Sequence, residues 1–226
     1  MNIKSIAMWA AGLAAMLACA LIVLPAVSFG DTQVGVTSQK TERFPVRPLL
    51  SADIKVLVDK GHGSGVHIGN GKFLTAAHVV KDAKVVRVKF TDKSIRDAKV
   101  LWVSQDYDIA LIDANGSGVN VAPLSCQEPP VGTNITLVGN PMQLEGITAF
   151  GRVAGSSREL ANWKSVIIVS GPSIPGQSGG PVYNEAHEVV GITVGLMGVN
   201  LGMFPSVSGY GSVVPMSAVC GLLARG

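Results

Sequence analysis

One serine in the sequence has a setting that suits a nucleophile. Ser178 follows Gly176-Gln177 and precedes Gly179-Gly180-Pro181, so it lies in a run of glycines between prolines. Glycine permits positive φ angles and lets the backbone approach a ligand closely. We therefore expect Ser178 on a tight turn, with the N–H groups of Gly176 and Ser178 directed at one point. Acyl transfer needs this combination of hydroxyl and donors, although an ordinary glycine turn between strands would have the same composition.

Two upstream segments contain the partners that a serine nucleophile needs. A serine hydroxyl requires a general base to accept its proton, and that base requires an orienting carboxylate. His78 ends the largely apolar segment 73–77, and Asp108 directly precedes the apolar segment 109–112. Asp106 is a second candidate for the carboxylate. Taken singly, the histidine could be a core residue and the aspartate could cap a turn, so the hypothesis depends on all three residues meeting.

The remainder of the chain must supply the scaffold, and its composition favours short strands. Of the 226 residues, 47% are hydrophobic and 15% charged, and the 27 Gly and 12 Pro are scattered at turn spacing. Such a chain can bury a substantial core. Asn70-Gly71 is a two-residue hairpin signal. The expected strands are 54–58, 65–68, 72–75, 85–90, 98–103 and 109–112, followed by 134–138, 147–153, 166–170, 181–183, 189–194 and 212–214.

This strand count predicts an all-β fold of two packed, six-stranded antiparallel β-barrels. The barrels are expected at about 49–115 and 131–215, with a short C-terminal helix at about 216–224. A single β-sandwich is the alternative that the pattern leaves open.

The first 30 residues differ from the rest. Lys4 precedes an uncharged, mostly apolar stretch at 6–24, and Pro25 and small residues follow. This pattern is typical of a secretory signal peptide, while its length also suits an uncleaved membrane anchor. Either interpretation predicts export: a periplasmic or secreted protein, or one anchored with its folded part outside the cytoplasm and touching the membrane only through this segment. Residues 31–48 are polar and aperiodic, which is typical of a linker.

The charge distribution and the histidine spacing exclude several functions. A net charge of +3 without a Lys/Arg run predicts no nucleic-acid partner. No His-Glu-x-x-His or Cys-x-x-Cys spacing occurs, so no catalytic metal or other cofactor is expected. His62, His67 and His187 are interpreted as structural or surface residues.

Three segments together resemble the chymotrypsin-like (trypsin-fold) serine proteases, and the chain order His, Asp, Ser is that of this family. They are Thr75-Ala76-Ala77-His78, Asp108-Ile109-Ala110-Leu111 and Gly176-Gln177-Ser178-Gly179-Gly180-Pro181. Three further segments are similar to the bacterial HtrA-type branch, namely Gly63-Ser64-Gly65-Val66, Gly139-Asn140-Pro141 and Gly211-Ser212-Val213-Val214-Pro215. HtrA-type enzymes often carry a PDZ domain after the protease domain, and none is expected in a chain that ends at Gly226.

The resemblance implies that residues 49–226 form a serine endopeptidase domain acting on polypeptides. His78 would take the proton of Ser178, Asp108 would orient the imidazole, and the N–H groups of Gly176 and Ser178 would bind the oxyanion. Asp108 is preferred to Asp106 because it directly precedes Ile-Ala-Leu, as in the family motif. A catalytically inactive, protease-like binding module is the alternative function.

The resemblance also gives an expectation for specificity. Pro172 stands where trypsin-type enzymes carry an acid, and Thr193 stands where glutamate-specific relatives carry a histidine. We therefore expect cleavage after small or medium apolar residues, with the substrate backbone adding as a strand beside 193–196. The expected substrate-binding residues are Pro172, Ser173, Thr193, Val194, Gly195 and Leu196, with Met197 nearby.

Two further positions are informative by comparison with the family. In zymogen-activated members, an aspartate at the first of these positions pairs with a newly cut N-terminal amine. Here the position is occupied by the uncharged Gln177. The oxyanion loop here is therefore expected to form unaided or to be ordered by substrate or a partner. Some members join the inter-barrel connection to the C-terminal helix by a disulfide. Cys126 and Cys220 fall near these places, so they are either bridged or free thiols.

Overall fold

A computed structural model describes residues 52–142, 144–200 and 205–225 of the chain. The expected leader and linker, residues 1–48, lie outside the described residues. Within the described ranges, no helix has the length and apolar character needed to cross a membrane.

The first barrel closes in the strand order β1-β2-β3-β6-β5-β4. A four-residue helix, α2 (Ala77–Val80), directly follows its third strand. All its strand pairs are antiparallel. The strands are β1 (Asp53–Val58), β2 (Gly61–Gly69), β3 (Lys72–Ala76), β4 (Val85–Lys89), β5 (Ile95–Ser104) and β6 (Ile109–Asp113).

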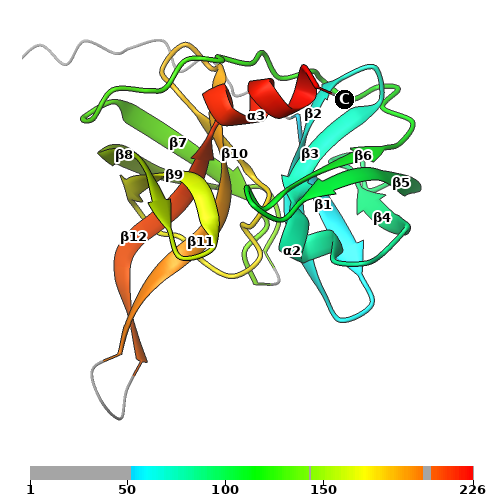
Figure 1. Ribbon diagram of the computed structural model, residues 1–226. Coiled ribbons are helices and arrows are strands. Elements are labelled where there is room, and N and C mark those ends of the chain that lie inside the picture. Colours follow the sequence, from blue (N-terminus) through cyan, green and yellow to red (C-terminus); the bar gives the residue numbers. More distant parts are fainter. Residues whose placement is uncertain (1–51, 143, 201–204, 226) are drawn as a thin grey trace, which may run out of the picture. The chain divides into compact units, whose positions relative to one another are not determined.

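The second barrel closes in the order β10-β11-β12-β9-β8-β7, and α3 (Met216–Leu223) follows it. Figure 1 shows the two barrels side by side, with α3 above them and the hairpin of β11 and β12 extending away from the second barrel. The strands are β7 (Asn134–Gly139), β8 (Ile147–Leu160), β9 (Trp163–Ser170), β10 (Pro181–Tyr183), β11 (Val189–Asn200) and β12 (Pro205–Pro215). The predicted fold class of two six-stranded barrels is confirmed, and the β-sandwich alternative is wrong.

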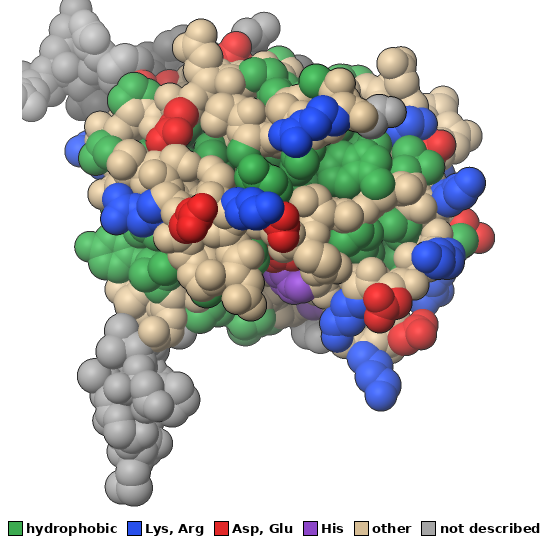
Figure 2. All heavy atoms as spheres, viewed as in Figure 1, with side chains coloured by type: hydrophobic (Ala, Val, Ile, Leu, Met, Phe, Trp, Pro, Cys, Tyr) green, Lys and Arg blue, Asp and Glu red, His purple; other side chains and the backbone are tan. Residues whose placement is uncertain are grey.

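Alternation of side chains along the strands builds the cores. In β4 the inward residues Val86 and Val88 are 4% and 0% exposed, while Val85 on the outer face is 57% exposed. A strand has a side-chain period of two, so one face packs inward and the other meets water. Figure 2 shows the Lys and Arg side chains of one face interspersed with Asp and Glu, in keeping with the dispersed charge of the sequence.

Turn chemistry also follows the sequence, whereas several strands are longer than predicted. Asn70 and Gly71 both have positive φ, 51° and 69°, as a type I′ hairpin turn requires. The expected strand 147–153 continues to Leu160 in β8, and 189–194 continues to Asn200 in β11. The expected strand 212–214 begins earlier, at Pro205 in β12.

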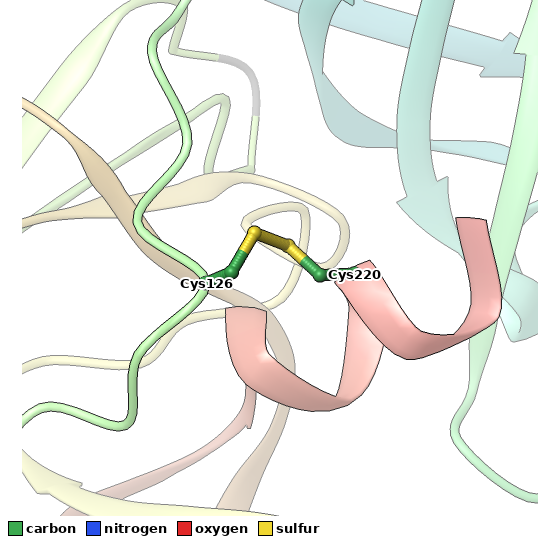
Figure 3. The surroundings of a disulfide bond; sticks show 2 residues. All are labelled: Cys126 and Cys220. Atoms are coloured by element: carbon green, nitrogen blue, oxygen red, sulfur yellow. A yellow bond between two sulfur atoms is a disulfide. The ribbon is translucent and has the colours of Figure 1, made fainter. Parts of the chain in front are cut away.

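A disulfide joins Cys126 to Cys220 across 94 residues of sequence. Figure 3 shows Cys220 on α3 and Cys126 on the extended connection between the barrels. The connection is also bonded to the second barrel, because Ser125 N donates to Val189 O over 3.0 Å. Of the two states that the sequence left open, the structure therefore contains the bridged one.

Candidate active site

Strand pairing in the first barrel brings His78 and Asp108 together. Strands β3 and β6 are antiparallel neighbours, and Ala76 at the end of β3 lies opposite Ile109 at the start of β6. The residue before β6 therefore lies beside the chain that leaves β3 and enters α2. The bond from Ala77 N to Asp108 O, 3.0 Å, extends this pairing by one step.

Two hydrogen bonds fix the imidazole of His78 against the carboxylate of Asp108. His78 Nδ1 lies 2.6 Å from Asp108 Oδ2, and His78 N donates to Asp108 Oδ1 over 2.8 Å. An ionised carboxylate only accepts hydrogen bonds, so Nδ1 carries the proton and Nε2 of the neutral ring keeps its lone pair. The aspartate is 4% exposed, whereas the histidine side chain is 48% exposed. The pair therefore presents a basic nitrogen to solvent and buries the group that orients it.

Asp106, the other candidate carboxylate, has a different partner. Its side chain forms an ion pair with Lys164, and both side chains are more than half exposed. The Asp106 carboxylate raises the pKa of Lys164 by hydrogen bonding and by its charge. Because the carboxylate at the histidine belongs to Asp108, the geometry agrees with the preference given by the sequence motif.

The loop at Ser178 is held through its backbone carbonyls. Every carbonyl from 174 to 178 accepts a hydrogen bond, and these bonds are Gln177 N to Ile174 O (3.1 Å), Met142 N to Pro175 O (2.9 Å), Ser64 Oγ to Gly176 O (2.7 Å), Gly180 N to Gln177 O (2.9 Å) and Ser64 N to Ser178 O (2.8 Å). In a trans peptide the C=O and N–H groups point in opposite directions. The N–H groups of Gly176 and Ser178 therefore face away from these partners. Neither donates to any other residue that the structure describes.

Gln177 orders the same loop from within. Its side chain is 2% exposed, and its Oε1 accepts a hydrogen bond from Ile174 N over 2.8 Å. Its Nε2 has no partner among the described residues. The neutral amide of Gln177 thus bonds to the start of its own loop, at the position where zymogen-activated relatives have an aspartate. Of the two alternatives for the oxyanion loop, this geometry favours a loop that forms unaided.

Close backbone contacts place the Ser178 loop against the strands that lead to His78. A Cβ added at Gly179 would lie 2.2 Å from Ser64 O and 2.7 Å from Ala76 N. A Cβ added at Gly63 would lie 2.5 Å from Val79 Cγ2 and 2.9 Å from Ser178 O. The sequence neighbours of His78 and the backbone of Ser178 therefore approach each other too closely for any side chain at these glycines.

A cavity of about 530 Å³ adjoins the histidine. It has walls from both barrels, because Val194 and Trp163 line it opposite the first-barrel residues. Trp163 packs over Gly195, where an added Cβ would lie 2.7 Å from Trp163 Cη2. The lining residues are His78, Gln105, Asp106, Asp108, Asn162, Trp163 and Val194.

The residues expected to bind substrate differ in burial. Ser173, Thr193 and Val194 are buried, Gly195 is half-buried, and Pro172 and Leu196 are exposed. The Ser173 hydroxyl donates to Gly195 O over 3.0 Å. Both backbone groups of Thr193 are already bonded, since Thr193 N donates to Gly180 O and Thr193 O accepts from Gly179 N. Both backbone groups of Thr193 are thus used within the barrel, and the pairing of a substrate strand beside residues 193–196 stays a prediction.

Two residues next to the Ser178 loop were not found as functional candidates by sequence reasoning. Ser64 holds the carbonyls of Gly176 and Ser178, and in the sequence it is only a small polar residue between glycines. His62, interpreted there as structural or surface, donates from Nε2 to Asn140 O over 2.8 Å. An added Cβ at Gly176 would lie 2.8 Å from that same Nε2. No local pattern marks either contact, since both connect segments distant in sequence.

The two-barrel fold, the bonded His78–Asp108 pair and the glycine-rich loop of Ser178 are features of the chymotrypsin-like serine proteases, and a family comparison agrees. Residues 63–192, more than half of the chain, match the family described as "Trypsin-like peptidase domain". The chain belongs to this family, and its homologues are HtrA/DegP-like serine endoproteases.

Individual relatives are similar over the same part of the chain. Protease Do-like 1, chloroplastic, of Arabidopsis thaliana is 30% identical over 176 residues, which are 74% of this chain and 39% of that protein. A probable periplasmic serine endoprotease, DegP-like, of Pseudomonas fluorescens is 34% identical over 134 residues, 58% of this chain and 28% of that protein. The chain thus spans well under half the length of these two relatives. The crystal structure of the serine endoprotease from Yersinia pestis shares the fold, with a TM-score of 0.68, 23% identity and coverage of 80% of this chain and 64% of that one.

Proposed function

We propose that this protein is a serine endopeptidase that hydrolyses polypeptides through an acyl-enzyme intermediate. One observation carries the proposal. The His78–Asp108 pair, fixed by bonds of 2.6 and 2.8 Å, lies at a cavity, and Gly179 of the Ser178 loop packs against Ala76, two residues before His78. Membership of the trypsin-like peptidase family supports the same reaction.

In the proposed reaction, Ser178 Oγ attacks the carbonyl carbon of the scissile bond while His78 Nε2 takes its proton. The imidazolium then gives that proton to the leaving amine, and the amide bond breaks to leave an ester on Ser178. A water molecule, deprotonated by the same nitrogen, hydrolyses the ester. Asp108 holds the ring in the required tautomer and stabilises the imidazolium, because its buried carboxylate is already bonded to Nδ1.

The N–H groups of Gly176 and Ser178 are proposed to bind the oxyanion. Their peptide planes are held from the carbonyl side by Met142 N and Gly180 N, at 2.9 Å each. Donors fixed before the reaction cost no reorganisation when charge develops, and each contributes about 3 kcal/mol in enzymes of this kind. Neither N–H group donates to a residue within the described ranges, which supports this role.

For specificity, we propose cleavage after small or medium apolar residues, with the substrate backbone adding beside Val194 to Leu196. The buried Val194 and the indole of Trp163 are the apolar residues that line the cavity at His78. A cleavage profile from a peptide library tests this proposal. Cleavage dominated by Arg or Lys would contradict it.

The proposed organisation is a protease domain at 49–226, a linker at 31–48 and an exported N-terminal leader or anchor at 1–30. The Cys126–Cys220 disulfide supports a site outside the cytoplasm, because disulfides persist in oxidising compartments.

Covalent labelling by a fluorophosphonate probe tests the catalytic proposal. The wild-type chain is expected to be labelled, and Ser178→Ala is expected to lose both labelling and turnover. Ser117→Ala, which removes an exposed hydroxyl from the inter-barrel connection, is the matched control and should label normally. A wild-type chain that resists the probe would instead identify a catalytically inactive binding module.

A further inference from the structure

Ser64 is a buried residue of the first barrel that contacts the nucleophile loop of the second. It lies on β2 and is 0% exposed. Its hydroxyl donates to Gly176 O over 2.7 Å, and its backbone N donates to Ser178 O over 2.8 Å. One residue thus holds two carbonyls of the loop, on either side of Gln177.

The direction of the Ser64 hydroxyl proton follows from its other partners. Asn140 N and Asn140 Nδ2 lie 2.9 and 3.2 Å from Ser64 Oγ, and both are N–H donors. The amide orientation of Asn140 is consistent, because Nδ2 also donates to Ile54 O and Oδ1 accepts from Gly146 N. A serine hydroxyl has one proton and two lone pairs. Since both Asn140 groups occupy the lone pairs, the single proton is directed to Gly176 O.

Gly176 has a backbone conformation that neighbouring contacts must hold in place. Its φ is 99°, and glycine adopts positive and negative φ about equally readily. The peptide before it is held by Met142 N on Pro175 O, and the peptide after it is held by Ser64 Oγ on Gly176 O. The two torsions of Gly176 are set by the relative orientation of these two peptides. Loss of the Ser64 hydroxyl would leave the second peptide held only by its N–H, through the 3.1 Å bond from Gln177 N to Ile174 O.

The surroundings of Ser64 leave little room for a substitute. A Cβ added at Gly139 would lie 3.0 Å from Ser64 Oγ, and a Cβ added at Gly180 would lie 3.3 Å from Ser64 Cβ. A larger side chain would press on the loop that carries Ser178. Position 64 therefore requires a small side chain that can donate a hydrogen bond, and serine meets both requirements.

We propose that Ser64 is a positioning residue. By bonding to Gly176 O it holds the peptide after Gly176, and so helps to keep the N–H group of Gly176 directed at the oxyanion. This inference rests on the proposed function, and it adds a first-barrel residue that acts on the nucleophile loop through Gly176 and Ser178. The expected contribution lies in the transition state, because the N–H group meets a full negative charge only there.

Ser64→Ala in the full chain tests the inference by steady-state kinetics on casein and on an apolar peptide amide. We expect kcat to fall about 10- to 100-fold, as slight misplacement of a catalytic group does, with KM within about twofold of wild type. The rate of fluorophosphonate labelling should fall in parallel. The acidic limb of the pH–rate profile should not shift, because the His78–Asp108 pair is not altered.

Ser165→Ala is the matched control, since its half-buried hydroxyl is bonded to Ser157 Oγ on β8, away from the loop. It should keep the wild-type kcat. If Ser64→Ala lowers Tm and keeps the wild-type kcat well below Tm, Ser64 serves stability alone and the inference is overturned.

A second variant covers the case in which Ser64→Ala does not fold. Ser64→Cys keeps a weak donor of similar size, so a smaller loss of kcat, about 3- to 10-fold, is expected from the weaker contact. An unchanged kcat in this variant would also overturn the inference. Failure of the proposed function gives a distinct result, because the wild-type chain itself would then resist the probe.

Discussion

The two barrels contribute to the site in different ways. The first barrel provides His78 and Asp108 at the ends of adjacent short strands, where two direct hydrogen bonds fix them. The second barrel provides a glycine loop whose proposed catalytic groups are one hydroxyl and two backbone N–H groups. This loop is positioned by neighbours such as Ser64 and Met142, outside its own strands. Substitutions at the His78–Asp108 pair should therefore change the chemistry, whereas those around the loop, including at Ser64, should change its geometry.

Asp108→Asn should have the largest effect of the substitutions that test this contrast. An amide at this position can donate to His78 Nδ1, so the proton moves to Nε2 and the ring cannot act as a base. We expect kcat to fall about 10⁴-fold at neutral pH with the fold retained, as loss of the orienting carboxylate does in such triads. Measurement of kcat and of the circular dichroism spectrum checks both parts.

Asp106→Asn is the matched control for that prediction. Its carboxylate is exposed and pairs with Lys164, so kcat should stay within about twofold of wild type. If the control variant were the inactive one and Asp108→Asn were active, the two aspartates would have to exchange their proposed roles.

Gln177→Met tests the second-barrel side with a smaller expected effect. The substitution keeps the size of the side chain and removes Oε1, which leaves Ile174 N without its 2.8 Å partner. An unpaired buried donor costs about 1–3 kcal/mol, and we expect it to appear as a roughly 10-fold lower kcat. Loss of Nε2 should cost little, since this atom has no partner among the described residues. A wild-type kcat in this variant would show that substrate or a partner, and not Gln177, orders the loop.

The same contrast separates what the sequence could predict from what it could not. Local patterns in the sequence indicate strands, turns and motifs. Examples are Asn70-Gly71, the alternating valines of β4 and the segments around His78, Asp108 and Ser178. The hydrogen bond from Ser64 to Gly176 joins residues 112 positions apart, and no local pattern reports it. The end of β8 was missed because no side chain beyond Val153 in that strand is buried, so hydrophobic alternation stops there.

The far part of β11 was missed for a related reason. Gly195 and Gly198 interrupt the β-rich composition, and the pairing with β12 shifts register near both of them. Strand pairing that continues beyond the core depends on backbone hydrogen bonds, which every residue can accept and every residue except proline can donate. The nucleophile half of the site depends on the same backbone bonds, which explains why its supporting residues were also the harder part to predict.

Removal of the disulfide should affect stability and leave the chemistry intact. Cys126 and Cys220 tie the connection to α3, away from the cavity at His78. The double variant Cys126→Ala/Cys220→Ala should lose about 2–4 kcal/mol of the free energy of unfolding, with kcat unchanged below Tm. Urea unfolding with and without reductant checks the first part, and the wild-type chain under reductant should match the double variant. A loss of kcat without a loss of stability would connect α3 to the site.

A charged contact between the barrels should have the smallest effect, confined to acid pH. Glu145, on the 140–146 loop, accepts bonds from Lys89 and Lys93 at 2.8 and 3.1 Å and from Lys55 at 3.4 Å. Hydrogen bonds from Lys89 and then Lys93 lower the pKa of Glu145 to about 2. Because the folded-state pKa lies below the unfolded one, the contact stabilises the fold above about pH 4.5 and loses this contribution as the pH falls towards 2.

Glu145→Gln should therefore reduce stability at pH 6 and have little effect near pH 2. The side chain is 28% exposed and the lysines are partly solvated, so screening limits the difference to about 1 kcal/mol at pH 6. Urea unfolding of both proteins from pH 6 to pH 2 measures it, and high salt at pH 6 should shrink it. A difference that persists at pH 2 would mean that packing of the loop, and not charge, accounts for it. Met142, near Glu145 in the same loop, donates from its backbone N to Pro175 O in the Ser178 loop. The kcat of Glu145→Gln at pH 6 therefore shows whether the charged contact with the first barrel, in addition to Ser64, positions the Ser178 loop.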